Sequence, residues 1–179
     1  MKWIWLIITL AFSNLQAQEL SSEKHEEEEF KHSRLALVIS HTHVPKAFQS
    51  STGSSNAVIV PSWGLNYEYW FSPKFALGLH SDMEVATYVI EKEDGTELER
   101  ERPIIVALVG IYNPWKGLEF IGGFGKEFEP HENFWVYRLG IEYEIEIGNE
   151  WDIAPGLIFD IKENLYDSWT LGLGVGKRF

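Results

Sequence analysis

The strongest candidates for chemistry are histidine and carboxylate side chains at every second position. His80, Asp82 and Glu84 lie at i, i+2 and i+4, a spacing that places three side chains on one face of a β-strand. Imidazole and carboxylate groups bind metal ions or relay protons. The same pattern also fits a water-filled set of hydrogen-bonded polar groups, and we favour that interpretation. We predict neither a metal site nor a cofactor.

A second pair of histidines, His41 and His43, flanks a hydroxyl and could supply a general base. The sequence contains no Gly-x-Ser-x-Gly elbow and no cysteine, which excludes a thiolate nucleophile and a disulfide framework. His80 and Ser81 are adjacent, so on a strand they point to opposite faces. His41 and His43 are therefore weak catalytic candidates, and the sequence favours a protein that is not an enzyme.

The segments that carry these residues alternate apolar and polar side chains, which is the pattern of β-strands. In the clearest one, Trp135 to Ile147, an apolar face of seven residues lies opposite Arg138, Glu142 and Glu144 among others. We predict eight strands, at 34–43, 57–70, 75–90, 102–113, 118–129, 133–147, 151–162 and 168–179. In the first and fourth, both faces are too apolar for an assignment.

The connections between these segments alternate in length. Those at 71–74, 114–117 and 148–150 are short, whereas 44–56, 91–101 and 163–167 are longer; the connection at 130–132 is a short exception. Short turns at one rim and longer loops at the other are typical of bacterial outer-membrane barrels, which also have an even number of strands. The sequence therefore predicts an all-β fold, an eight-stranded antiparallel up-and-down transmembrane β-barrel.

The polar faces are predicted to point into the barrel. They combine charged residues with glycines such as Gly64, Gly140 and Gly156, which leave space in a narrow interior, whereas aromatic residues gather near strand ends. The predicted polar network of the lumen is Glu68, His80, Asp82, Glu84, Arg138, Glu142, Glu144, Asp152, Asp160 and Arg178. Simple hairpin registers set Arg138 opposite Asp160, Asp152 opposite Arg178, and Asp160 opposite Thr170.

The N-terminal residues read as a targeting segment. Lys2, an apolar run and a small residue at Ala17 predict a signal peptide at 1–17. An acidic flexible periplasmic leader at 18–33 and the barrel at 34–179 follow. The leader contains His25, His32 and four consecutive glutamates, for which we favour a solvated tail over a metal site.

The chain resembles the small eight-stranded outer-membrane barrels of Gram-negative bacteria, the class of the OmpA membrane domain and OmpX. The resemblance covers 34–179 and is sharpest at the C-terminus, where Leu171, Leu173, Val175 and Phe179 match the assembly signal of that class. Lys177 departs from the pattern, because an apolar or aromatic residue is usual there. The resemblance implies recognition by the barrel-assembly machinery and contact with outer-membrane lipid and lipopolysaccharide.

The net charge of −12 argues against nucleic acid as a partner. We therefore expect a monomeric integral protein of the bacterial outer membrane, exported through the periplasm, with a structural role or a role in passage of small solutes or ions. An outer-membrane enzyme acting on lipid or lipopolysaccharide and a soluble secreted ligand-binding barrel are the alternatives.

Overall fold

The computed structural model describes residues 30–45, 47–48, 57–91, 95–130, 132–162 and 166–179. The predicted signal peptide and most of the predicted leader lie outside these residues. The strands are β1 (Ser33–Pro45), β2 (Ala47–Phe48), β3 (Ala57–Ser72), β4 (Phe75–Glu84), β5 (Thr87–Glu91), β6 (Glu97–Glu101), β7 (Ile104–Trp115), β8 (Leu118–Phe128), β9 (Phe134–Tyr143), β10 (Ile145–Gly148), β11 (Trp151–Lys162) and β12 (Asp167–Arg178). No helix in the described part is long and apolar enough to cross a membrane.

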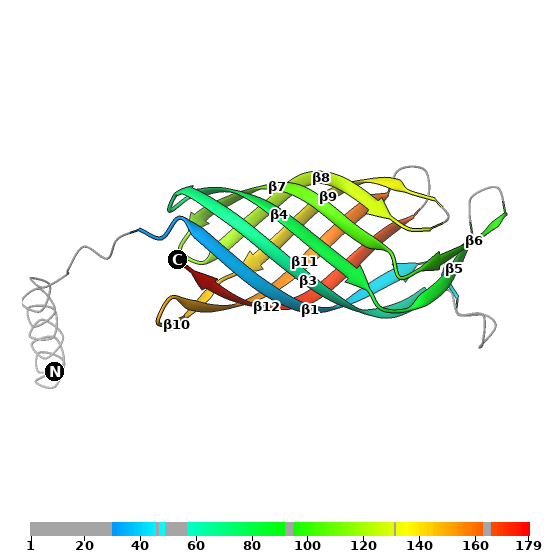
Figure 1. Ribbon diagram of the computed structural model, residues 1–179, viewed down its shortest axis with the longest axis horizontal. Helices are drawn as coiled ribbons and strands as arrows, with labels where there is room; N and C mark the ends of the chain where they lie inside the picture. The colour runs from blue at the N-terminus through cyan, green and yellow to red at the C-terminus, as the bar shows by residue number, and fades with distance from the viewer. Residues whose placement is uncertain (1–29, 46, 49–56, 92–94, 131, 163–165) are drawn as a thin grey trace, which may run out of the picture. The chain divides into compact units, whose positions relative to one another are not determined.

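Eight antiparallel strands close into a barrel (Figure 1). The order is β1, β3, β4, β7, β8, β9, β11 and β12, and β12 pairs back onto β1. Strand β10 continues β9 beyond Glu144 and pairs with β11. The predicted fold class is confirmed, and closure leaves the barrel without a free sheet edge.

The two ends of the barrel differ. The end that holds the start of β1 and the end of β12 has tight turns and is called the turn end below (Figure 1). One of its turns runs through Asn149 and Glu150 with φ of 52° and 68°, the left-handed values that match the twist of a two-residue hairpin. The opposite end, where β5 and β6 lie, is called the loop end.

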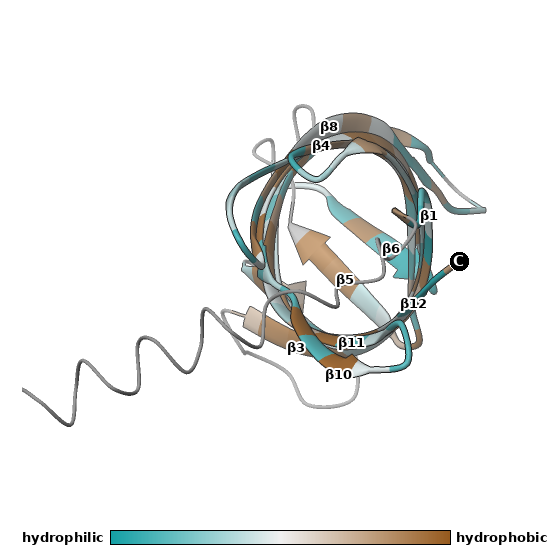
Figure 2. Ribbon diagram, turned by 90° about the vertical axis from the view of Figure 1, so that its left-hand side faces the viewer, coloured by the Kyte–Doolittle hydropathy of each residue, from teal (hydrophilic) through white to brown (hydrophobic). Residues whose placement is uncertain are grey.

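A second sheet of three strands, β2, β5 and β6, lies at the loop end. It projects within the outline of the barrel when viewed along the barrel (Figure 2), so this cap sheet lies across the mouth. The predicted strand 75–90 divides into β4 and β5 because the chain bends at Val85 and Ala86. On the return path, Arg102 takes a φ of 46° and Pro103 has no N–H for a ladder hydrogen bond.

Burial alternates along the barrel strands and assigns every face. In β9, Trp135, Tyr137 and Leu139 are exposed, whereas Val136 and Arg138 are buried. The prediction that polar faces point inward is confirmed. The faces that the sequence left open are also assigned: β1 turns Arg34, Ala36, Ser40, Thr42 and Val44 inward, and β7 turns Ile105, Ala107, Val109 and Ile111 inward.

One predicted register is right and two are wrong. Arg138 lies opposite Asp160, as expected. Asp152 lies opposite Gly176 rather than Arg178, and Asp160 lies opposite Ser168 rather than Thr170. A shift of two residues leaves every side chain on its own face, so the apolar alternation does not distinguish these registers. The observed register holds along the whole pair, from Trp151 opposite Lys177 to Ile161 opposite Asp167.

Candidate functional site

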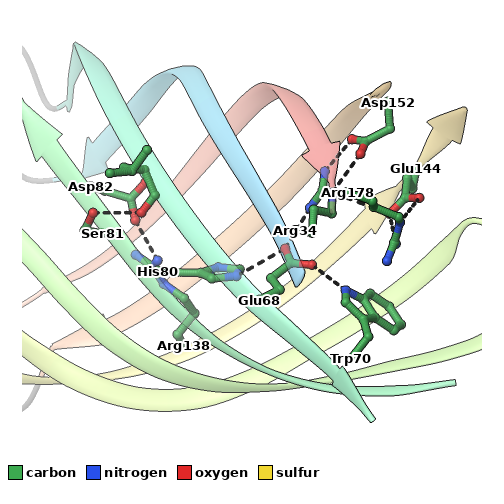
Figure 3. Close-up of polar contacts among 11 residues, drawn as sticks. Arg34, Glu68, Trp70, His80, Ser81, Asp82, Arg138, Glu144, Asp152 and Arg178 are labelled. Carbon is green, nitrogen blue, oxygen red and sulfur yellow. Dashed lines mark hydrogen bonds and ion pairs between the residues drawn. The ribbon is translucent and has the colours of Figure 1, made fainter. Parts of the chain in front are cut away.

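The lumen near the turn end is organised around Arg34, which β1 projects inward. Its Nε and Nη2 donate to the two carboxylate oxygens of Asp152 at 2.9 and 2.6 Å, a bidentate pair. Its Nη1 donates to Glu68 Oε1 at 2.7 Å (Figure 3). Arg34, Glu68 and Asp152 are all at most 1% exposed. A single guanidinium thus joins β1, β3 and β11 across the interior.

A second arginine completes the turn-end network. Arg178 donates from Nη2 to Glu144 Oε2 at 2.5 Å, and its guanidinium lies 4.7 Å from the ring centroid of Trp70. The indole of Trp70 in turn donates to Glu68 Oε2 at 3.0 Å. The predicted pairing of Asp152 with Arg178 is replaced by Arg34–Asp152 and Arg178–Glu144, because the register differs by two residues.

The middle of the lumen is crossed by Arg138. Its Nε and Nη2 donate to Asp160 at 2.8 Å each. Its Nη1 donates to Asp82 Oδ2 at 2.6 Å (Figure 3). These contacts connect β9 with β11 beside it and with β4 across the interior. The sequence predicted the pairing of Arg138 with Asp160. The contact with Asp82 could not be predicted, because β9 and β4 meet across the interior only when the barrel closes.

His80 lies between these two networks. It is buried, and its Nε2 lies 3.7 Å from Glu68 Oε1. It borders a small cavity with a volume of about 20 Å³, enough for about one water molecule. The cavity is lined by Val38, Asn66, His80, Asp82, Arg138, Glu142, Ala154, Gly156, Ile158, Thr170 and Gly172. Such a space fits ordered water and is far too small for a diffusion pore.

Glycines provide the room that these charged groups occupy. A Cβ atom on Gly176 would lie 2.6 Å from Asp152 Oδ1 and 2.7 Å from Arg34 Nε. A Cβ on Gly64 would lie 2.8 Å from Asp82 Oδ1. The polar faces are therefore rich in glycine because the neighbouring strands carry charged side chains that lie over these positions in a narrow interior.

The predicted triplet His80, Asp82 and Glu84 does not form one group, because its members have different neighbours. All three face inward from β4, but Asp82 binds Arg138, whereas Glu84 lies nearer the loop end and its Oε2 has no hydrogen-bond partner in the described part. Within the described ranges, no group of three or more histidine or acidic side chains is placed to hold a metal ion.

The loop end has buried charges besides Glu84, and those on β6 and β8 were not predicted from the sequence. Arg100 of β6 is fully buried, forms an ion pair with Glu127, and donates to Glu129 Oε2 at 3.1 Å. Lys162 lies 3.4 Å from Glu127 and donates to Ser168 Oγ at 2.7 Å. A cap-sheet arginine is thus tied to the barrel wall at β8.

Two tyrosines add a neutral contact at the same end. The hydroxyls of Tyr88 and Tyr166 lie 3.0 Å apart, and both rings are buried with Val44, Val60 and Ile90. Burial raises the pKa of Tyr88 and of Tyr166 above the usual tyrosine range. Both phenols are therefore neutral at physiological pH and can share this hydrogen bond.

For three of the inward residues that the sequence did not identify, the reason is clear. Arg34 belongs to a strand whose faces the sequence left unassigned, and Arg100 belongs to a segment expected to be a loop. Glu119 alternates with the outward Phe120, so the pattern of 118–129 contains the signal that identifies it. Of the predicted lumen residues, all ten point inward, and the contacts above connect eight of them: Glu68, His80, Asp82, Arg138, Glu144, Asp152, Asp160 and Arg178.

The catalytic candidates lie on the outer face. His41 is exposed, and the imidazole of His43 stacks on Trp169 with centroids 4.8 Å apart. The buried Nδ1 of His43 has no hydrogen-bond partner among the described residues. In the described part of the chain, this placement does not bring either histidine together with a nucleophile for which it could act as a general base.

The C-terminal motif also faces outward. Leu171, Leu173, Val175 and Phe179 are exposed on the outer surface, and the backbone of Phe179 pairs with Ser33. Lys177 lies on the same face with its Nζ 5.2 Å from the ring centroid of Trp151. A lysine is accommodated at this position because its chain covers an indole near the turn end while its charge reaches the rim.

Comparisons with known proteins support the fold. No family model matches the sequence, and no curated protein matches it in sequence. Among solved structures, Ail of Yersinia pestis with the heparin analogue sucrose octasulfate matches with a TM-score of 0.55 and 12% identity over 84% of this chain and 100% of that chain. Neisserial surface protein A matches with a TM-score of 0.54 and 11% identity over 82% and 97%.

The N-terminal barrel domain of Pseudomonas aeruginosa OprF gives a TM-score of 0.53 and 13% identity over 84% of this chain and 100% of that domain. At these identities the comparisons establish the fold alone. This chain has the fold of the small eight-stranded outer-membrane barrels, as the sequence resemblance predicted.

Proposed function

We propose that this protein is an integral outer-membrane barrel that acts as a closed structural anchor and holds its cap sheet at the cell surface. The observation that carries the proposal is the reversal of polarity between its two surfaces. Apolar and aromatic side chains cover the outside, among them Leu37, Leu65, Leu79, Leu108 and Leu139, each between 47 and 56% exposed. So continuous an apolar surface is unfavourable for a monomer in water, whereas it is favourable in the hydrocarbon core of a membrane.

Aromatic residues mark the two borders of this band. Near the turn end, Tyr69, Phe71, Phe75 and Tyr112 are exposed, and the rings of Phe75 and Tyr112 stack 5.0 Å apart. Toward the loop end lie Trp63, Trp135 and Trp169. Aromatic girdles at both borders are the arrangement that places a barrel in a bilayer. We assign the turn end to the periplasm and the loop end to the cell surface.

The interior favours a closed anchor over solute passage. Arg34 and Arg138 cross it with hydrogen bonds to several strands, and an apolar cluster of Trp70, Ala107 and Val109 fills part of the space beside them. The cap sheet lies across the mouth at the loop end (Figure 2). An eight-stranded barrel has an interior that side chains can fill.

The exposed surface of the cap sheet is acidic. Glu97, Glu99 and Glu101 are exposed on alternate positions of β6. One structural neighbour, Ail, was solved with a heparin analogue, but an acidic surface repels such polyanions, so we do not extend that ligand to this chain.

Membrane fractionation tests the localisation. We expect the protein to stay in the carbonate-washed outer-membrane fraction and to change gel mobility on heating, because a folded barrel migrates differently from the unfolded chain. Release as a soluble protein would overturn the proposal and favour the secreted ligand-binding barrel.

Planar-bilayer recordings test closure. The purified barrel is expected to show no steady solute-sized conductance. A variant without residues 86–102 is the matched comparison, because it lacks β5 and β6 of the cap sheet but retains the barrel strands. A stable open channel in the intact protein would support passage of small solutes or ions instead.

Mass spectrometry of lipid A tests the enzyme alternative. The masses are compared with and without expression of the protein, and with His41→Ala; a mass change that depends on His41 would support an enzyme.

A further inference from the structure

Glu119 is a carboxylate buried inside the barrel. It lies in β8, is 0% exposed, and neither of its carboxylate oxygens has a hydrogen-bond partner in the described part of the chain. The other buried acids of the turn-end network are bonded to Arg34 or Arg178. An isolated ionised carboxylate in such a place is strongly unfavourable. Glu119 therefore needs a cation, a proton or a hydrogen-bond donor that the network does not provide.

A second carboxylate lies directly opposite Glu119. The register pairs it with Glu142 of β9, whose side chain is also buried and faces the lumen. Side chains opposite each other on one face of an antiparallel pair have Cβ atoms about 5 Å apart. Gly156 of β11 leaves space for the side chain of Glu142, because a Cβ there would lie 2.6 Å from its Cγ. The register places the two buried acids on neighbouring strands at directly opposite positions of the same face.

The surroundings of the pair contain more acid than base. The charges that act on Glu119 are those of Glu68, Glu144, Arg34 and Glu142. Those that act on Glu142 are Glu68, His80, Arg34 and Asp82. Arg34 is the one permanent cation among these groups, and it already bonds Glu68 and Asp152. Two ionised carboxylates at this point would repel each other and the acids around them, and the described part of the chain offers no hydrogen-bond donor to Glu119.

We propose that Glu119 and Glu142 form a proton-binding site, in which one carboxyl group is protonated at neutral pH and donates a hydrogen bond to the other carboxylate. The ligand is a proton rather than a metal ion, because the described residues bring no third ligand into metal-binding geometry here. The bound proton lowers the negative charge of the turn end by one and completes its hydrogen-bond network. This site depends on the barrel interior and not on the cellular location of the protein.

Infrared spectroscopy of the folded barrel in lipid vesicles tests for this proton directly. At pH 7 the wild-type protein is expected to show the C=O stretch of a protonated carboxyl, shifted by exchange into D2O. The band should be lost in Glu119→Gln and in Glu142→Gln, and kept in Glu146→Gln, whose side chain is exposed. Absence of the band from the wild type, or its persistence in both lumen variants, would overturn the proposal.

The pH dependence of unfolding gives a second, independent readout. A proton that the folded barrel keeps and the unfolded chain releases makes the folded-to-unfolded ratio fall about tenfold for each pH unit above the ordinary carboxyl range. This loss should continue with rising pH until the pair also ionises in the folded barrel. Glu119→Gln should remove the dependence, because its amide can donate the same hydrogen bond without a titrating proton.

If Glu119→Gln does not fold, Glu142→Gln provides the same two readouts. Equal pH dependence in the wild type and the folded variant contradicts a proton site. The unfolding series is repeated with added Ca²⁺, with added Mg²⁺ and with a chelator. Stability that follows the divalent cation, without a protonated-carboxyl band, would identify a metal site and overturn the proposal.

Discussion

The two ends of the lumen are closed by different interactions. At the turn end, the barrel strands themselves supply buried ion pairs, with Arg34 joined to Glu68 and Asp152. At the loop end, a separate sheet packs Tyr88 and Ile90 onto Val44 and Val60, and Arg100 adds buried ion pairs. The turn end is therefore closed by side chains of the barrel strands themselves, whereas the closure of the loop end depends on the hairpin of β5 and β6, which extends beyond those strands.

Because of this difference, we expect the turn end to govern the stability of the barrel and the loop end to govern access to the lumen. Buried charges that join several barrel strands must remain matched for the barrel to stay closed, because an unmatched charge in the interior is costly. The cap sheet can loosen while the ladder of the barrel strands is kept. We therefore expect substitutions at the turn end to change global unfolding and substitutions at the loop end to change local opening of the mouth.

The largest effect is expected from Arg34→Ala. It leaves the carboxylates of Glu68 and Asp152 buried without their cation, which should lower the free energy of unfolding by about 3–5 kcal/mol. Urea unfolding in lipid vesicles, followed by heat-dependent gel mobility, measures this loss. Lys74→Ala is the control, because Lys74 is exposed at the same end. Equal stability of the two variants would contradict the central role of Arg34.

Arg100→Ala should have a smaller global effect, about 2 kcal/mol, since water can reach the mouth once the cap sheet loosens. Its main result is expected to be faster proteolytic cleavage in 86–102 with the barrel still folded. Limited proteolysis with mass spectrometry measures the site and the rate. A loss of stability as large as that of Arg34→Ala, without local cleavage, would show that the two ends are equivalent.

Alkaline pH should act on the loop end through its buried phenols. The pKa of Tyr88 and of Tyr166 is raised by burial, so the unfolded chain ionises these groups near pH 10 while the folded protein keeps them neutral. Stability is therefore complete below about pH 10 and is lost as pH rises above it. Ultraviolet titration should show these two tyrosines ionising after the exposed ones; simultaneous ionisation would contradict a sealed mouth.

Tyr166→Phe removes the hydroxyl that meets Tyr88 and should cost about 1 kcal/mol. Hydrogen exchange of the β5 and β6 amides should rise, while exchange in β8 and β9 stays unchanged. Tyr137→Phe is the matched control, because Tyr137 is exposed on the outer face. Faster exchange throughout the barrel would mean that the cap sheet and the walls unfold as one unit.

The smallest effect is expected at the outer rim of the turn end. Lys177→Gln removes a cation held over Trp151 and should cost about 0.5–1 kcal/mol. Urea unfolding in vesicles measures the stability, and the rate of folding into vesicles measures insertion. A Lys177→Leu variant, which restores the usual apolar character of the C-terminal motif, is the comparison; a loss of several kcal/mol in either variant would contradict a rim contact.

Period-two alternation explains how much of the fold could be predicted. Trp135 to Ile147 has an apolar face opposite Arg138 and Glu142, and the structure places these two faces outside and inside. The hairpin between β9 and β11 is tight, so Arg138 opposite Asp160 followed from counting residues. Across the longer connection between β11 and β12, the same counting was wrong by two residues, because alternation is unchanged by an even shift.

The strand pattern of this sequence by itself determined eight strands, their antiparallel order and, for most of them, the side that faces outward, since these follow from local alternation and turn length. Only the tertiary structure decided which charges meet. Arg138 reaches Asp82 and Arg34 reaches Asp152 across the interior, and Glu119 lies opposite Glu142 with no hydrogen-bond partner among the described residues. Contacts between strands distant in sequence depend on the register at which the barrel closes, and local alternation does not encode that register.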